Sequence, residues 1–534
     1  PRIVTAPPSA LPVGVPPRAA ADGPAQRVTV ESPLYRYTFS TGGAAMVGAE
    51  LLRYPSLLEE DAPVQLVPSG TLDFLAYRLA VGDDTLDLRS LPFRVSAPAL
   101  RLGEDAPPSP LRFVYSGVAG LEVEIVYTFR PDQYLIQLRG TISGAPPGAV
   151  LLTELGPGLA SRDDEREIAL VALQEGDAEQ ISFPEQGEAV VIEGPLPWAG
   201  VKDKYFLAAL VTGGNPPFSR VVARRLPTPR AGREESSSEP RPRITALAAL
   251  PLDASGSFAY DVFVGPQEND VLLEVGYGLE EVTPYGYRWL RPVVRPIAAA
   301  TLWVLSYLHN ILGVSYGWAL ILFGIMVKLV LWPLNAKAMR AQMRNMAVQP
   351  LLQELQAKHK DDPQRQQQEM VRLYKEHGFN PLAGCLPLLI PMPVFITLFF
   401  VFQNAIAFRG TEFWWMPDLS QKDPYYIIPI LFVISTFLAQ WVSTKLSGME
   451  TNPQMKMMMY VLPVVMGVFF FNFASGLNLY YTASNVAGLP QQVLIARERR
   501  RATEAAKVKQ VTQPTLSTAA GPAKKARPAK KRKK

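Results

Sequence analysis

Hydrophobic and polar residues alternate in short runs along the first half of the chain, a pattern typical of half-buried β-strands. Clusters of Gly, Pro and Asp separate these runs. The clearest case is a hairpin in which residues 121–129 and 134–139 flank Arg130-Pro131-Asp132-Gln133. Further strands are expected at 35–39, 93–95, 112–115, 149–155, 205–211, 243–250 and 258–264. Many strands with few helical stretches predict an all-β antiparallel sandwich over residues 32–284, with 226–242 as an exposed loop.

Long apolar runs replace this alternation in the second half. A spanning helix needs about 20 largely apolar residues. Five segments meet this requirement: 316–334, 382–404, 425–442, 457–473 and 477–496. Lys328 is the one charge in the first segment, and Pro387, Pro391 and Pro393 interrupt the second. Five such runs favour spans over buried core helices, so we expect an α-helical polytopic membrane domain over residues 316–496.

The stretch 285–315 connects the two halves. Leu305, Leu308 and Leu312 recur at helical spacing within 297–314, which predicts an amphipathic helix lying along a membrane surface. His309 lies on this helix and is interpreted as an interfacial polar residue rather than a metal ligand.

A helical hairpin is expected within residues 335–379. Met339, Met343 and Met346 step along its first helix, and Met370 lies on its second, which begins at Pro363. Methionine is flexible and polarizable, so these side chains suit contact with varied client or partner proteins. A simple packed hairpin with a solvated charged face is an equally acceptable interpretation.

Charge divides the chain into three parts. Residues 1–300 hold 26 basic and 37 acidic residues, residues 301–496 hold 13 and 9, and residues 497–534 hold 14 and 2. Basic loops face the cytoplasm. The hairpin, the loop 443–456 and the C-terminus are therefore predicted to be cytoplasmic, and residues 1–315 and 405–424 extracytoplasmic. The tail 497–534 is predicted to be disordered and to bind ribosomes or anionic lipid.

The two ends and the single cysteine add little chemistry. Residues 1–31 are rich in Pro and Ala and indicate a linker, so we expect a spanning helix upstream of Pro1. Cys385 is the only cysteine, which excludes an intrachain disulfide, and we interpret it as a small packing residue.

Enzyme signatures are missing from the sequence. It contains no P-loop, no H-E-x-x-H and no C-x-x-C. The three histidines are His309, His359 and His377, so the β-rich half has none. We therefore expect no catalytic residues, no metal and no cofactor.

Several motifs follow one another in the second half: Lys328-Leu-Val-Leu-Trp-Pro-Leu334, Gln349-Pro350, Asn380-Pro-Leu-Ala-Gly-Cys-Leu-Pro-Leu-Leu-Ile390, Met392-Pro393, Asp423-Pro-Tyr-Tyr426, Ser475-Gly-Leu-Asn-Leu-Tyr-Tyr481, Ser484-Asn485 and Gln491-Gln492. Together they resemble the YidC family of bacterial membrane insertases. The match covers residues 285–500 in order and spacing. The β-rich half resembles the family's periplasmic domain more weakly, through Val264-Gly-Pro266 and Tyr285-Gly286.

The resemblance implies a β-supersandwich in the periplasm and five inner-membrane helices that form a hydrophilic groove. Through this groove the family inserts and folds nascent membrane proteins without nucleotide hydrolysis, alone or beside the Sec translocon. Two departures matter: Lys328 stands where the family usually has Arg, and Pro391 where it usually has Gln. A lysine is a point charge and lacks the bidentate geometry of arginine.

Candidate groove residues follow from the polar positions in the spans: Lys328, Gln403, Gln440, Asn478, Tyr481, Ser484 and Asn485. Family correspondence favours Lys328, Gln440 and Tyr481. Each polar side chain can instead join helices by hydrogen bonds. A small-solute transporter and a membrane-anchored carbohydrate enzyme are the rival functions. The transporter would predict paired inverted repeats, which five unequal spans do not provide.

Overall fold

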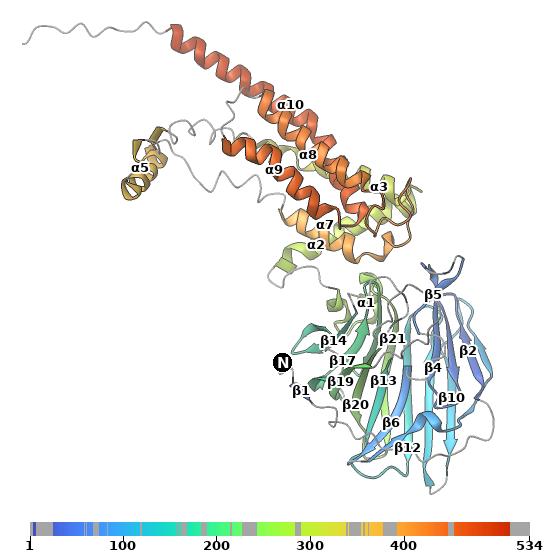
Figure 1. The fold of residues 1–534 in the computed structure, drawn as a ribbon. Helices are drawn as coiled ribbons and strands as arrows, with labels where there is room; N and C mark the ends of the chain where they lie inside the picture. Colours follow the sequence, from blue (N-terminus) through green and yellow to red (C-terminus); the bar gives the residue numbers. More distant parts are fainter. Residues whose placement is uncertain are drawn as a thin grey trace, which may run out of the picture. The chain divides into compact units, whose positions relative to one another are not determined.

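A computed structural model shows two compact units (Figure 1). The β unit contains residues 1–300 and Ile396–Ser420, and the helical unit contains Thr301–Phe395 and Gln421–Lys534. The structure describes residues 4–6, 25–57, 59, 61–67, 74–82, 84–117, 120–156, 159, 161, 168–182, 189–213, 216–226, 243–283, 290–337, 340, 354–355, 358–360, 362–376, 392–446 and 453–512.

The larger sheet of the β unit has twelve strands among the described residues. Ten of them follow one another in the order β1 (Val4–Ala6), β16 (Ala189–Leu196), β19 (Phe218–Leu226), β20 (Arg243–Pro251), β13 (Val150–Leu155), β6 (Phe74–Val81), β4 (Met46–Pro55), β3 (Tyr35–Ser40), β2 (Arg27–Glu31) and β9 (Ala99–Arg101). β5 (Pro63–Gln65) pairs with β4, and β7 (Asp84–Asp87) pairs with β6.

The smaller sheet has nine strands within the same described ranges. Their order is β15 (Asp177–Ser182), β14 (Ala169–Gln174), β17 (Trp198–Lys202), β18 (Phe206–Val211), β21 (Ser257–Pro266), β12 (Leu135–Ser143), β11 (Glu122–Phe129), β10 (Ser109–Ser116) and β8 (Arg94–Val95). The predicted hairpin is confirmed as β11 paired antiparallel with β12, from Glu122 opposite Ser143 to Thr128 opposite Gln137.

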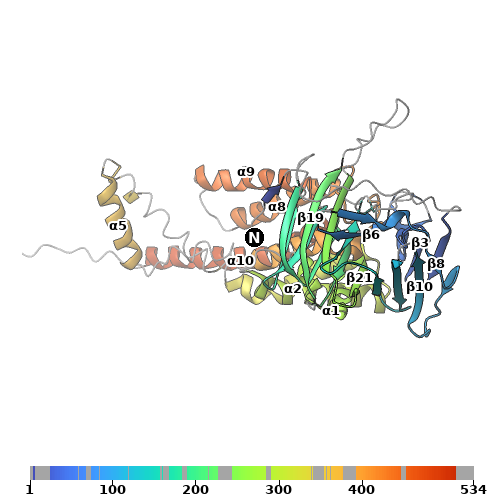
Figure 2. The ribbon, with the colours of Figure 1, turned by 90° about the horizontal axis from the view of Figure 1, so that it is seen from below.

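The two sheets enclose one core, which confirms the predicted sandwich. In Figure 2 strands β19, β6 and β3 of the larger sheet lie on one side and β21 and β10 of the smaller sheet on the other. β11 shows why it folds this way: Val123, Ile125, Tyr127 and Phe129 are buried while the residues between them are not. This inward set packs against aromatic residues of the larger sheet, such as Phe39.

Buried hydroxyl groups join the sheets across this core. The Tyr77 and Tyr127 hydroxyl oxygens lie 2.5 Å apart, and Thr153 Oγ1 lies 2.8 Å from the Tyr260 hydroxyl. The Tyr37 hydroxyl donates to the Val264 carbonyl at 2.8 Å. Each bond satisfies a polar atom that would otherwise be costly to bury.

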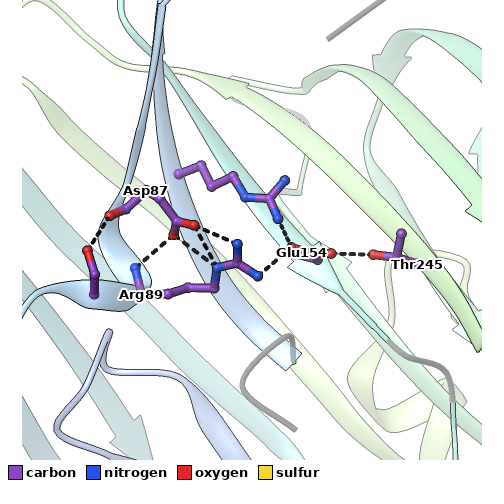
Figure 3. Close-up of polar contacts among 6 residues, drawn as sticks. Asp87, Arg89, Glu154 and Thr245 are labelled. Carbon is purple, nitrogen blue, oxygen red and sulfur yellow. Dashed lines mark hydrogen bonds and ion pairs between the residues drawn. The ribbon is translucent and has the colours of Figure 1, made fainter. Parts of the chain in front are cut away.

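A charged cluster lies on the larger sheet around Glu154 of β13, which is 4% exposed (Figure 3). Arg78 of β6 donates to its carboxylate at 2.7 Å, and Thr245 of β20 donates at 2.7 Å. Arg89 lies 4.0 Å away on a 3-10 turn, Leu88–Ser90, and also donates to Asp87 at 2.9 Å. The carboxylate is thus paired from three different segments of the chain.

Residues Ile396–Ser420 belong to the β unit and include most of α7 (Met392–Asn404). Ile406, on a 3-10 turn at Ile406–Phe408, joins the core cluster of the sandwich. Arg409 is buried, its Nη1 donates to the Pro55 carbonyl at 2.5 Å, and its guanidinium carbon lies 5.3 Å from the Phe206 ring centroid. Part of the predicted outer loop 405–424 therefore packs on the β-sandwich.

The remaining helices follow the chain order. They are α1 (Asn269–Val275), a 3-10 turn at Leu279–Val282, α2 (Arg291–Ser306) with a π-helical turn at Tyr307–Ile311, α3 (Tyr316–Val330), α5 (Pro363–Glu376), α8 (Ile427–Leu446), α9 (Pro453–Phe470) and α10 (Ser475–Thr512). None of the described helices is both long enough and apolar enough to cross a membrane. The count of five spans stays a prediction.

Three boundaries differ from the sequence-based expectations. β1 and β2 lie inside the segment 1–31 that was expected to be a linker, because their residues pair with β16 and β3. The helix expected at 297–314 begins at Arg291, and its buried side is formed by Val294, Ala298 and Leu305, whereas Leu312 is exposed. α10 continues to Thr512, so the first part of the tail expected to be disordered is helical.

Candidate functional site

Two helices of the helical unit, α3 and α10, pack side by side in parallel. An ideal Cβ at Gly324 of α3 would lie 3.1 Å from the Tyr480 carbonyl oxygen and 3.4 Å from the Ser484 nitrogen of α10. Two turns later Gln491 of α10 donates to the Trp332 carbonyl at 2.8 Å, and beyond it Arg340 pairs with Glu498 at 3.1 Å. Glycine permits the close approach, and the contacts advance together along α10 and along the chain from α3 into the residues that follow it.

Lys328 lies in the middle of this packed pair, one turn after Gly324, and is half-buried. No Asp or Glu occurs in any of the five predicted spans. An ammonium group in such surroundings needs water or polar atoms around it, because an isolated buried charge is costly. Lys328 is therefore the residue of the candidate set with the strongest electrostatic reason to be functional.

Two of the other candidates bind neighbouring helices. Asn485 Nδ2 donates to Ser435 Oγ at 3.2 Å and to Thr436 Oγ1 at 2.9 Å, which joins α10 to α8. Asn478 is fully buried, and its Nδ2 donates to the Phe470 carbonyl at 3.0 Å, which joins α10 to the end of α9. These are the helix-joining contacts that the alternative interpretation expects of polar residues in spans.

Tyr481 lies in an aromatic cluster. Its ring centroid is 5.4 Å from that of Phe395, 5.7 Å from Phe470 and 6.3 Å from Phe432, on three different helices. Its hydroxyl oxygen is buried and has no hydrogen-bond partner among the described residues. A buried hydroxyl without a partner is unusual, so this atom retains an unused capacity to form a hydrogen bond.

Three candidates in the predicted spans remain. Gln440 lies on α8 and Ser484 on α10, both half-buried in the helical unit. Gln403 lies on α7 within the β unit. Pro391 and Cys385 lie outside the described residues.

The hairpin expected at residues 335–379 is described in part. Its second helix is α5, which begins at Pro363 as predicted, with the Arg365 backbone N–H donating to Asp362 at 3.0 Å. Met370 lies on α5 and is half-buried. Met339, Met343 and Met346 lie outside the described residues.

No group of metal-binding side chains occurs within the described ranges. His309 stacks on Tyr316 with ring centroids 4.0 Å apart, and its Nδ1 lies 2.9 Å from the Val314 carbonyl oxygen. These contacts account for the position of His309 in a turn between two helices.

Buried carboxyl groups in the β unit have structural partners. Burial raises the pKa of Asp203, which accepts from Ser161 and from the backbone N–H groups of Tyr205 and Phe206 at 2.9 and 2.7 Å. Burial also raises the pKa of Glu268, which accepts from the Tyr54 hydroxyl at 2.8 Å. Asp203 closes the turn between β17 and β18, so its geometry is that of a turn-forming residue.

The sequence predicted only some of the residues that form the contact between α3 and α10. Gly324 and the Gln491 bond to Trp332 were not expected from the sequence. Gly324 lies four residues before Lys328 on the same helix face, and this spacing between a small residue and a charge is the signal that could have identified it.

Comparison with known proteins identifies both units. The family model described as "YidC periplasmic domain" matches residues 27–300, and the model described as "60Kd inner membrane protein" matches residues 307–503. Among curated relatives, the membrane protein insertase YidC of Chlorobium phaeovibrioides is 31% identical over 516 residues, covering 89% of this chain and 84% of the relative. The YidC of Syntrophus aciditrophicus is 29% identical over 484 residues, covering 89% and 85%.

Solved structures show weaker similarity. A crystal structure of an active YidC insertase, with its first transmembrane domain resolved, has 17% sequence identity and a TM-score of 0.34, covering 90% of this chain and 94% of that chain. A galactose mutarotase related enzyme from Lactobacillus acidophilus has 8% identity and a TM-score of 0.28, covering 45% of this chain and 97% of that one. On the two family models and the curated relatives, the chain belongs to the YidC family of membrane protein insertases, inner-membrane proteins with a periplasmic domain.

Proposed function

We propose that this chain inserts and folds nascent membrane proteins through a hydrophilic groove in its helical unit, open to the cytoplasm and to lipid. The observation that carries the proposal is Lys328, a half-buried cation on α3 packed against α10. The five predicted spans contain no acidic residue. Tyr481, whose hydroxyl has no partner in the part of the chain that the structure describes, and Gln440 would supply uncharged polar contacts.

The insertases of this family are not enzymes. The mechanism that we propose needs no nucleotide. A polar segment is costly to move through hydrocarbon, and an aqueous groove in half of the membrane shortens that path. Burial of the client's apolar segment in lipid supplies about 25 cal/mol per Å². The membrane potential adds a further driving force for the translocation of charged segments.

The topology that we propose has five spans, at 316–334, 382–404, 425–442, 457–473 and 477–496. Residues 1–315 would face the periplasm, and the hairpin 335–379 and the C-terminus the cytoplasm. The charges of the loops support this orientation, since 335–379 carries eight basic residues and 405–424 carries two. The methionines of the hairpin would contact clients or partners.

We propose three partners besides the client: the Sec translocon, the ribosome and anionic lipid. α10 continues past the last predicted span to Thr512 and carries Arg497, Arg500 and Arg501 on its exposed surface. A helix rises about 1.5 Å per residue, so this arm would project a basic surface toward the cytoplasm. The tail beyond it adds eight basic and no acidic residues at 513–534.

Reconstitution in liposomes tests the proposed function. The purified full chain is reconstituted in liposomes that contain no other protein. It should insert a small single-span client into them, measured as the fraction of client that becomes protected from protease. Deletion of residues 25–283 should leave insertion within about twofold of the full chain, because the proposed groove lies in the other unit. Loss of insertion on this deletion, at equal protein level, would instead favour a function centred on the β unit.

Ribosome binding tests the tail. Deletion of 513–534 should weaken co-sedimentation with ribosomes at low salt by about tenfold or more, because contacts with RNA phosphates release counterions. Replacing the eight basic residues of this segment with glutamine should have the same effect at unchanged length. The difference from the full chain should vanish at high salt. Equal co-sedimentation of the two proteins at low salt would refute tail-mediated ribosome binding.

A further inference from the structure

Gly488 of α10 is buried and has no room for a side chain, because Lys328 of α3 occupies the space. A Cβ built on Gly488 would lie 2.6 Å from Cε and 3.1 Å from Nζ of Lys328. The first distance is too short for a van der Waals contact between carbon atoms of two different residues, so one of them would have to move. The end of the lysine side chain therefore lies in the notch that the missing side chain of Gly488 leaves on α10.

The two helices are held together on both sides of this contact. Toward the N-terminus, Gly324 packs against the backbone of Tyr480 and Ser484, and toward the C-terminus Gln491 donates to the Trp332 carbonyl. Helices fixed in this way cannot separate cheaply at Gly488 alone. A methyl group at position 488 would therefore displace the flexible end of Lys328 rather than the helix backbones.

The position of this ammonium group has consequences, since no acidic residue of the predicted spans can hold it in place. Its position depends on where its four-carbon stem rests, and the stem rests on Gly488. We propose that Gly488 is a positioning residue, which seats the Lys328 stem and so fixes where the insertase presents its positive charge to a client. This inference rests on the proposed role of Lys328 in insertion.

Chemical labelling tests the seat directly, without a client. The full chain in liposomes is treated with acetic anhydride, and acetylation of Lys328 is followed by mass spectrometry. Gly488→Ala should raise the labelling rate of Lys328 about threefold or more, because the displaced amine moves out of its notch. Lys445, which is exposed on α8, serves as the internal control and should react at an unchanged rate. An unchanged rate at Lys328 would overturn the proposal.

A double-mutant cycle tests the consequence for insertion. Gly488→Ala should lower insertion of a client with an acidic translocated segment about threefold, but have no effect in a Lys328→Ala background, because the two residues act through one contact. Alanine is also a better helix former than glycine, so lost helix stability is not expected to explain the effect.

Gly324→Ala is the matched control for helix packing, since its added methyl would meet backbone atoms of α10 rather than Lys328. It should lower insertion of acidic and neutral clients alike, in both backgrounds. If Gly488→Ala behaves in the same way, Gly488 is only a packing residue and the proposal is wrong. If Lys328 labelling rises in Gly488→Ala while Lys328→Ala inserts both clients normally, the seat is confirmed and the proposed role of Lys328 fails.

Discussion

Lys328→Ala is expected to reduce insertion of clients with acidic translocated segments about tenfold, and insertion of neutral clients far less. A charge near the middle of the membrane costs roughly 3 kcal/mol on the insertion scale, and a fixed opposite charge offsets part of that cost for an acidic segment. The measurement is protease protection of paired clients that differ in two or three carboxylates, in liposomes containing equal amounts of insertase.

Lys328→Arg should retain insertion of both clients, because it keeps the charge and a stem of similar length. Lys445→Ala removes an exposed lysine of α8 and should leave both clients within about twofold of the unmodified chain. Equal insertion of acidic and neutral clients by Lys328→Ala would show that this charge has no part in the mechanism.

Glu154→Ala is expected to destabilise the β unit by about 2–4 kcal/mol. Removal of one partner from a buried ion pair typically costs about 3–5 kcal/mol, and the expected value is lower here because the Arg78 and Arg89 side chains are 25% and 28% exposed. Thermal unfolding of the full chain in detergent, followed by near-ultraviolet circular dichroism of the aromatic core, should report the loss.

Two smaller substitutions calibrate this effect. Thr245→Val removes one hydrogen bond to Glu154 and should cost about 1 kcal/mol. Glu124→Ala breaks an ion pair between Glu124 and Arg112, whose charged atoms lie 2.7 Å apart on the smaller sheet and whose side chains both contact solvent. It should lower the free energy of unfolding by under about 1 kcal/mol. If Glu154→Ala costs no more than Glu124→Ala, the cluster in Figure 3 does not stabilise the fold.

The same cluster predicts a dependence on pH. Burial opposes ionisation of Asp87, but hydrogen bonds and the charge of Arg89 outweigh it and lower the pKa of Asp87 from its usual 3.8. A carboxyl group with a lowered pKa stabilises the fold above its unfolded pKa and loses that contribution as the pH falls through the folded value. The stability difference between the unmodified chain and Asp87→Asn should therefore shrink below pH 3.8.

Local patterns were sufficient for some elements of this protein. Alternation between residues 121 and 139 predicts β11, β12 and the turn between them, because a hairpin joins neighbours in sequence and its two faces meet different solvents. The start of α5 at Pro363 also follows from local sequence, because proline is favoured at the first helical position. The division into an all-β half and an apolar helical half follows from alternation in the first half and long apolar runs in the second.

Pairing between distant segments decided what the sequence left open. β2 lies in a Pro- and Ala-rich stretch and becomes a strand because β3 and β9 supply its hydrogen-bond partners. Glu154 meets Arg78 and Thr245, which lie 76 and 91 residues away, and only the strand order of the larger sheet brings them together. Periodicity within one strand contains no information about which strand will lie beside it.

The candidate site shows the same division between sequence and tertiary structure. The sequence by itself determined that Lys328 is a lone cation in an apolar segment, since that depends on residues next to it in the chain. Only the tertiary structure decided that its stem rests on Gly488, that Asn485 binds α8, and that Tyr481 lies among aromatic rings. These contacts depend on the register of packed helices, which is set by the shapes of both surfaces at once.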